Sequence, residues 1–190
     1  MAEALTAPLV AADLTEGPAT RLRSLFDGHY DFVWRSLRRL GVADEAVDDA
    51  AQEVFLVAAR KIAKIQGGNE RSFLFGTALR IASDARRQQK KGAARSAGES
   101  ALERIQDPRP NPEEQLEQTR ARALLDQVLA ELPMDLRVVF VLFELEGMSM
   151  AEMAVCLELP QGTVASRIRR ARQHFQASVK RLQAATRGQS

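Results

Sequence analysis

The sequence has only one cysteine, Cys156, so no disulfide can form within the chain. Aromatic residues make up only 5% of it. No apolar run approaches the roughly 18 residues that span a bilayer. The N-terminus also lacks the basic start and the apolar stretch of a signal peptide. These absences exclude a disulfide-stabilised secreted domain, and they predict a cytoplasmic protein without membrane insertion.

The sequence also lacks the residue patterns of an enzyme. It has no Gly-rich phosphate loop, no nucleophile paired with a base and no metal-ligand spacing. His29, His174 and Cys156 are far apart in the sequence and form no ligand motif. We therefore expect no catalytic residues, no metal and no cofactor, and a function based on binding.

Acidic residues are absent from Gln161 to the end of the chain, whereas basic residues are frequent there. The basic residues of this stretch are Arg167, Arg169, Arg170, Arg172, Lys180, Arg181 and Arg187. An earlier basic cluster comprises Arg80, Arg86, Arg87, Lys90, Lys91 and Arg95. Two separate basic clusters predict two contact surfaces for a polyanion such as DNA. The alternative for each cluster is an ordinary solvated helix face.

Apolar residues recur at the spacing of one helix face, and no segment of useful length alternates with the period of a strand. This predicts an all-α fold of two small helical domains, a three-helix lobe and a helix-turn-helix lobe, joined by a flexible linker. The N-terminal helices are expected from 20 to 40, from Asp44 as N-cap to Gly67, and from 70 to 90. The predicted organisation is a disordered leader at 1–19, a domain at 20–91, a linker at 92–112, a domain at 113–183 and a tail at 184–190.

The linker is acidic and contains prolines, which favour an extended path. Its acidic residues, some of them at the start of the next predicted helix, are Glu99, Glu103, Asp107, Glu113, Glu114 and Glu117. They either mimic a nucleic-acid strand or belong to an ordinary solvated tether.

The C-terminal lobe has the proportions of a helix-turn-helix. Its first helix is expected from 113 to 131, and Pro133 is expected at the first position of the next, which Gly147 ends. Ser149 and Glu152 have the spacing of a capping box, which predicts a short helix that ends at Leu157. A final helix is then expected from 162 to 182. In this motif the second helix lies in the major groove.

The start of that final helix carries the candidate DNA contacts. Its polar stripe, suited to base edges, consists of Thr163, Ser166, Arg167 and Arg170. Arginine pairs bidentately with guanine. Arg169 and Arg172 flank the stripe and suit phosphate contacts.

Two stretches of the chain resemble one protein family. The later stretch is LPMDLRVVFVLFELEGMSMAEMAVCLELPQGTVASRIRRARQHF, and it resembles the −35-reading region of the extracytoplasmic-function sigma factors of bacterial RNA polymerase. Its matching residues are Leu132, Pro133, Arg137, Phe140, Glu146, Gly147, Ser149, Glu152, Ala154, Thr163, Val164, Ser166, Arg167, Arg170, Ala171 and Arg172. The earlier stretch, LFDGHYDFVWRSLRRLGVADEAVDDAAQEVFLVAARKI, resembles region 2, with matches at Asp49, Gln52, Glu53, Val54 and Phe55.

Besides the −35 surface of the final helix, the resemblance implies two contact sites. Asp49, Gln52 and Glu53 share one helix face and would dock on a basic coiled coil of core RNA polymerase. The third helix would open the −10 element and hold one strand, which calls for basic residues and a place for an unstacked base. Its candidate residues are Phe73, Arg80, Asp84, Arg86 and Arg87.

The sequence departs from the family pattern at three positions. Phe73 and Arg80 stand where the family generally has Trp and Asn, so the −10 preference is expected to differ from the common type. Phe73 is alternatively a core residue. Glu158 stands where Gly is common, which predicts either strain of about 1 kcal/mol at a positive φ or a turn shifted by Pro160.

The function implied is that of a sigma factor, which directs core polymerase to −35/−10 promoters and helps to open the −10 element. Its expected partners are core RNA polymerase, promoter DNA and an anti-sigma factor. The alternative is a free-standing helix-turn-helix regulator that binds its operator as a dimer.

Overall fold

A computed structural model describes residues 17–93 and 112–187, which contain helices and turns and no strand. The α-helices are α1 (Pro18–Arg39), α2 (Asp44–Lys61), α3 (Glu70–Ala93), α4 (Pro112–Glu131), α5 (Met134–Phe140), α6 (Met150–Leu157) and α7 (Gln161–Arg187). A 3-10 turn, Ile62–Lys64, follows α2, and a π-helical turn, Val141–Leu145, follows α5. The all-α prediction is confirmed.

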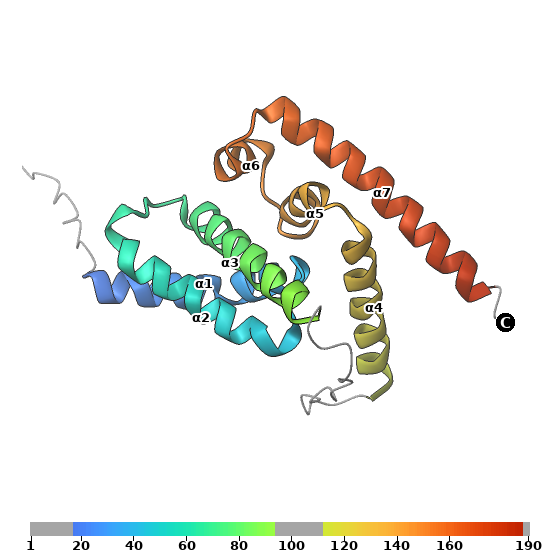
Figure 1. The fold of residues 1–190 in the computed structure, drawn as a ribbon. Coiled ribbons are helices and arrows are strands. Elements are labelled where there is room, and N and C mark those ends of the chain that lie inside the picture. The colour runs from blue at the N-terminus through green and yellow to red at the C-terminus, as the bar shows by residue number, and fades with distance from the viewer. Residues whose placement is uncertain (1–16, 94–111, 188–190) are drawn as a thin grey trace, which may run out of the picture.

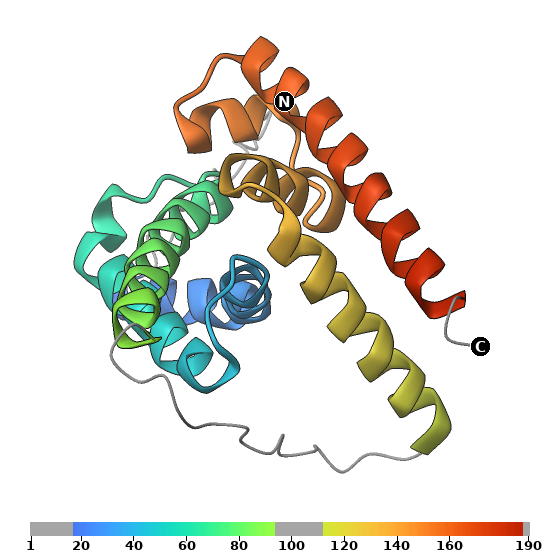
Figure 2. The same ribbon diagram turned by 45° about the vertical axis from the view of Figure 1, so that its right-hand side comes forward.

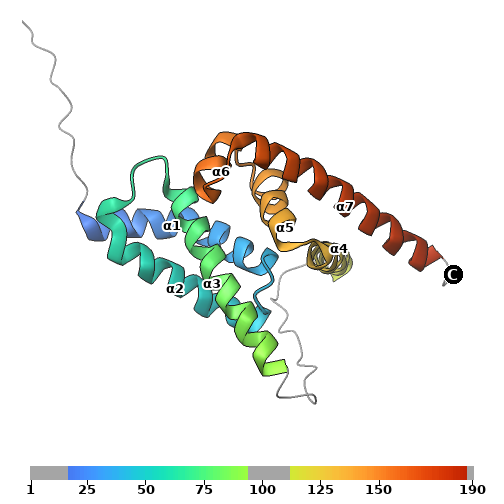
Figure 3. The same cartoon turned by 45° about the horizontal axis from the view of Figure 1, so that its top comes forward.

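The helices form two lobes (Figure 1). The N-terminal lobe consists of α1, α2 and α3, which pack on one another in pairs. In the C-terminal lobe, α7 lies along the outer edge and packs against α4, α5 and α6 (Figure 2). The lobes touch where α6 packs on α3, as Figure 3 shows from above.

Each lobe buries the apolar stripe that its helices present. In the N-terminal lobe Val47, Ala51 and Val54 of α2 are fully buried, and Phe55 is 7% exposed. In the C-terminal lobe the stripe of α7 is buried at Val164, Ile168 and Ala171, and Phe140 is 6% exposed. Burying a side chain of this size stabilises the fold by about 1.5–3 kcal/mol.

Several predicted helix boundaries were wrong by a few residues. Helix α1 begins at Pro18, inside the predicted leader, because proline suits the first helical turn. Ala43, rather than Asp44, is the N-cap of α2, and Asp44 lies in its first turn where its charge favours the positive helix end. Likewise Pro133 is the N-cap of α5 and not its first helical residue.

Helix α7 continues to Arg187, beyond the predicted end at 182 and into the predicted tail. Helix α3 reaches Ala93 and α4 begins at Pro112, so both ends of the predicted linker are helical. The leader at 1–16 and the linker from 94 to 111 lie outside the described residues. No helix within the described ranges is long and apolar enough to cross a bilayer.

Candidate nucleic-acid interface

The helix-turn-helix of α6 and α7 begins with the predicted capping box. The Ser149 hydroxyl accepts a hydrogen bond from the backbone N–H of Glu152 at 3.2 Å, and the Glu152 carboxylate accepts one from the Ser149 N–H at 2.8 Å. The Ser149 hydroxyl also donates to the Glu152 carboxylate at 2.7 Å, and this bond, followed by the one from the Ser149 N–H, lowers the pKa of Glu152. These hydrogen bonds fix the start of α6 and satisfy backbone donors that the helix itself leaves unpaired.

The turn between the two helices passes through Glu158, which has φ 53° and ψ 42°. Of the two alternatives that the sequence left open, the structure therefore shows the positive φ. The backbone N–H of Glu158 still caps α6 at Val155, as glycine does in this position. A side chain in the left-handed region costs about 1 kcal/mol.

The predicted recognition residues lie at the start of α7, opposite its buried stripe. Ser166, Arg169, Arg170 and Arg172 are exposed, whereas Thr163 and Arg167 are half-buried. The Ser166 hydroxyl donates to the Thr163 carbonyl at 2.9 Å, so its proton is already used within the helix. This leaves its oxygen as an acceptor.

The arginines of α7 fall into two kinds. Arg167 lies 3.8 Å from the Asp135 carboxylate, and Arg172 donates to Glu144 at 2.6 Å, so both are oriented by acids of the α5 segment. No ion pair within the described ranges involves Arg169 or Arg170, which are exposed. Arg169 and Arg170 are therefore available to an anion. Arg167 and Arg172 have to give up their carboxylate partners before they can bind one.

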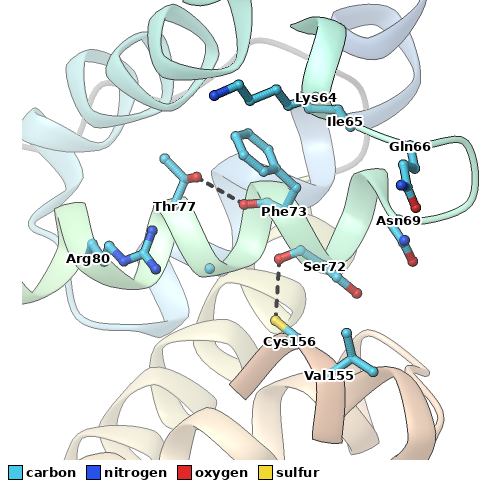
Figure 4. Close-up of a pocket in the computed structure, with 11 residues that line it drawn as sticks. Lys64, Ile65, Gln66, Asn69, Ser72, Phe73, Thr77, Arg80, Val155 and Cys156 are labelled. Atoms are coloured by element: carbon cyan, nitrogen blue, oxygen red, sulfur yellow. Dashed lines mark hydrogen bonds between the residues drawn. The ribbon is translucent and has the colours of Figure 1, made fainter. Parts of the chain in front are cut away.

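The start of α3 and the loop before it line a pocket of about 360 Å³ (Figure 4). Its residues from this part of the chain are Lys64, Ile65, Gln66, Asn69, Ser72, Phe73, Gly76, Thr77 and Arg80. Phe73 is half-buried and points from α3 toward Lys64, and the Thr77 hydroxyl donates to its carbonyl at 2.9 Å. An aromatic ring, a lysine and an arginine thus meet in one hollow.

The remaining residues predicted on α3 do not join this pocket. Asp84 and Arg87 pair with each other at 2.7 Å on an exposed part of the helix. Arg86 lies beside Gly41 and Arg137, where α3 faces the C-terminal lobe. The predicted surface of α3 is therefore divided, with only Phe73 and Arg80 in the hollow.

The C-terminal lobe completes the pocket with two residues that the sequence analysis did not place there. Val155 and Cys156 of α6 line it from below α3 (Figure 4), and the Cys156 thiol donates to the Ser72 carbonyl at 3.3 Å. Burial raises the pKa of Cys156 to about 11. Nothing in the local sequence indicates this contact, because it joins segments 84 residues apart.

On α2 the side chains of Asp49, Gln52 and Glu53 are all exposed on one face. Beside them an apolar groove of about 730 Å³ runs between α1 and α2. Its lining includes Phe26 and Leu56, which are 42% and 52% exposed. Neither residue was predicted from the sequence, although a leucine four residues after Gln52, outside the buried stripe, was a signal of an exposed apolar face.

These features define a class: an all-α, two-lobed protein whose helix-turn-helix presents an acid-free basic helix to solvent, as in DNA-binding proteins. Comparison with known families is more specific. Residues 25–92 match the family described as Sigma-70 region 2, and residues 122–175 match Sigma-70, region 4.

Known proteins with this arrangement are similar along most of the chain. The RNA polymerase sigma-H factor of Pseudomonas aeruginosa is 31% identical over 74% of this chain and 76% of its own length. The ECF RNA polymerase sigma-E factor of Escherichia coli K12 is 28% identical over 96% and 98%. The chain belongs to the extracytoplasmic-function group of the sigma-70 family.

A third relative is longer. The ECF RNA polymerase sigma factor SigE of Mycolicibacterium smegmatis is 31% identical over 77% of this chain, which spans 57% of that protein. Two solved structures share the fold, each with a TM-score of 0.63. CnrH, solved with the cytosolic domain of CnrY, is 23% identical over 86% of this chain and 94% of its own. RpoE of Bartonella quintana, solved with the anti-sigma factor NepR, is 19% identical over 83% and 96%.

Proposed function

We propose that the chain is a promoter-specificity subunit of bacterial RNA polymerase that acts in the cytoplasm and has no catalytic activity of its own. Helix α7 reads the −35 element, the pocket at α3 holds the −10 strand, and α2 docks on core polymerase. One observation carries the proposal: two separate candidate DNA surfaces and an exposed polar face occur in a single chain with the sigma-70 pattern.

For the −35 element, Arg170 is the principal candidate for base contacts because it is exposed and has no acidic partner within the described ranges. A guanidinium pairs bidentately with guanine in the major groove. Arg169 suits a phosphate on the same side. Arg167 and Arg172 reach DNA by exchanging Asp135 and Glu144 for it.

For the −10 element, the pocket at the start of α3 combines what an unstacked base and its backbone require. The Phe73 ring offers an apolar surface for the base, and Arg80 and Lys64 offer charge for phosphates. At about 360 Å³ the hollow lies within the range of small-ligand sites. Asp84 and Arg87, paired with each other, play at most a secondary part in this proposal.

For core polymerase, the proposed surface is the face of Asp49, Gln52 and Glu53 together with the groove beside it. Acidic side chains attract a basic partner, and the exposed Phe26 and Leu56 provide apolar area for a helix of that partner to bury. Interfaces of this kind combine an apolar centre with a polar rim.

In vitro transcription tests the proposal. The purified chain, added to bacterial core polymerase and genomic fragments, should yield promoter-dependent transcripts that core enzyme alone does not produce. A gel shift on the same fragments should require core polymerase. A tight shift without polymerase on a palindromic site would instead indicate a free-standing dimeric regulator, which the comparisons do not favour.

A pull-down with core polymerase tests the docking surface. Glu53→Ala should weaken core binding about tenfold, or 1.4 kcal/mol, because it removes a charge at the centre of the proposed interface. Glu131→Ala makes the same change of charge at an exposed site in the other lobe and should leave core binding unchanged. Equal losses from both variants would contradict this surface.

We also propose an anti-sigma partner, because CnrH and RpoE, which share this fold, were solved with partner proteins. The tagged full-length chain, isolated from its own cells before induction, should carry a stoichiometric partner. That partner should suppress promoter-dependent transcription when it is added back. Recovery of a fully active chain without a partner would contradict the proposal.

A further inference from the structure

Besides the Arg38–Asp126 ion pair at 2.9 Å, the two lobes are joined by a carboxylate that lies among three arginines. The Glu146 side chain, which is 3% exposed, belongs to the C-terminal lobe just before the helix-turn-helix. Arg39 donates to it, and the guanidiniums of Arg35 and Arg71 lie 3.5 and 3.7 Å away. Arg71 also donates to the Glu146 carbonyl at 2.6 Å. All three arginines belong to the N-terminal lobe, so this cluster spans the contact between the two lobes, which we call the seam.

The position of Glu146 depends on an unusual piece of backbone. The π-helical turn after α5 places the Glu146 N–H on the Val141 carbonyl at 3.0 Å, five residues back. Gly147 follows with φ +65°, which turns the chain toward α6. Single π-turns are rare and occur frequently at functional sites. Here the turn directs the carboxylate across the seam.

The same seam carries a repulsive contact. Arg137 is 5% exposed, its Nε has no hydrogen-bond partner among the described residues, and Arg86 of the other lobe lies nearby. Burial and Arg86 together lower the pKa of Arg137 to about 10. Contact between the lobes therefore combines an attraction at Glu146 with a desolvation cost at Arg137, which reduces the net stabilisation of the closed arrangement.

The closed seam also determines what reaches the pocket at α3. While Glu146 holds the lobes together, Val155 and Cys156 of α6 form part of the pocket wall (Figure 4). Arg71, at the start of α3, is bound to Glu146 and so is not free for a phosphate. A strand that follows α3 through the pocket would meet α6 on one side, and it would compete with Glu146 for Arg71, which precedes the pocket residue Ser72.

We propose that Glu146 is an autoinhibitory latch: it holds the free protein in a closed state in which α6 closes one side of the pocket at α3 and Arg71 is held by Glu146. Latching and capture of a single DNA strand are mutually exclusive. The second half of this inference depends on the proposed function, because it assigns the pocket to the −10 strand. When the lobes open, Arg35, Arg39 and Arg71 become available to phosphates, which bind guanidinium as a carboxylate does.

The single cysteine provides a readout that needs neither DNA nor polymerase. Cys156 lies in the seam, half-buried, so its alkylation by N-ethylmaleimide should require the lobes to open. In the purified full-length protein, Glu146→Gln should accelerate alkylation about tenfold, a typical coupling between two sites. Glu144→Gln is the matched control, because Glu144 pairs with Arg172 inside its own lobe. It should leave the rate unchanged.

If Glu146→Gln lowers the melting temperature, faster alkylation could come from a general loss of stability, so a second variant is needed. Arg39→Gln removes the latch from the other lobe and should accelerate alkylation to a similar extent. An unchanged rate in both variants, or an equal increase in Glu144→Gln, would overturn the latch and leave the proposed function intact.

The DNA half of the inference is tested by fluorescence anisotropy with a pool of random single-stranded 12-mers. Since apparent affinity scales with the fraction of open protein, Glu146→Gln should bind the pool more tightly by the factor by which alkylation rises. Faster alkylation without a gain in affinity would overturn the mutual exclusion and, with it, the assignment of the pocket to the −10 strand.

Discussion

The two candidate DNA surfaces differ in how the protein presents them. In the C-terminal lobe the start of α7 is open to solvent, with Arg169 and Arg170 exposed. In the N-terminal lobe the pocket at α3 is shared with Val155 and Cys156 of the opposite lobe. If Glu146 acts as the proposed latch, the first surface is accessible in the free protein, whereas the second becomes accessible to a strand only when the lobes move apart. A protein that recognises two promoter elements through surfaces with these properties would bind the −35 element first.

The difference follows from how each surface is built. The recognition surface depends on one continuous stretch, with a capping box, a tight turn and the apolar stripe of α7. The pocket depends on segments 84 residues apart, which the Cys156–Ser72 contact brings together while the Glu146 cluster holds the lobes against each other. Local motifs form in any arrangement of the two lobes, whereas contacts across the seam exist only in the closed arrangement.

The start of α7, which is the open surface of the two, is tested most strongly by Arg170→Ala. Loss of a bidentate arginine should lower promoter-dependent transcription by about 2 kcal/mol, or roughly 30-fold, while core binding in a pull-down stays the same. Arg181→Ala is the control, because Arg181 lies on the same helix and pairs with Glu131. Similar losses from both variants would mean that α7 binds DNA by charge alone.

The sequence predicted the local geometry of the C-terminal helix-turn-helix well because its determinants are local. The Ser149–Glu152 box is formed as expected, and Val164, Ile168 and Ala171 are buried. The positive φ of Glu158 was one of two alternatives, and hydrogen bonding at the end of α6 selected it.

The sequence could not predict the seam. Nothing near Glu146 indicates that arginines from α1 and α3 surround it, because the π-turn that directs it has no simple sequence signal. Periodicity along α3 also gave no sign that Arg86 lies beside Arg137 of the other lobe, because a second lobe covers a side of α3 that periodicity alone left free.

The pocket at α3, which is the covered surface of the two, is tested next by Arg80→Asn. This change introduces the residue that the family generally has. Arg80 lines the pocket and is exposed, so the change should alter the −10 preference without altering stability. Exchange of one contact should shift the preferred base at one position by about tenfold. Sequencing transcripts from a promoter library with a randomised −10 element measures the shift. An unchanged preference would remove Arg80 from the reading surface.

The smallest expected effect concerns the turn that joins α6 to α7. Glu158→Gly should raise the free energy of unfolding by about 1 kcal/mol, because glycine adopts the left-handed backbone without strain. Gly147→Ala makes the reverse change at φ +65°, where an added Cβ meets no atom within 4 Å, so only backbone strain is added. It should lower the free energy of unfolding by a similar amount.

Urea denaturation of the two variants measures both changes in the free energy of unfolding. The rate of Cys156 alkylation in the same variants shows whether the two surfaces are independent of each other. The turn at Glu158 orients α7 within its own lobe, so Glu158→Gly should leave Cys156 alkylation as it is. Gly147 lies next to Glu146, so strain there should also loosen the seam and accelerate alkylation. If Glu158→Gly changed the alkylation rate as much as Gly147→Ala, the open and covered surfaces would be coupled through the helix-turn-helix itself. The seam would then not be the element that distinguishes them.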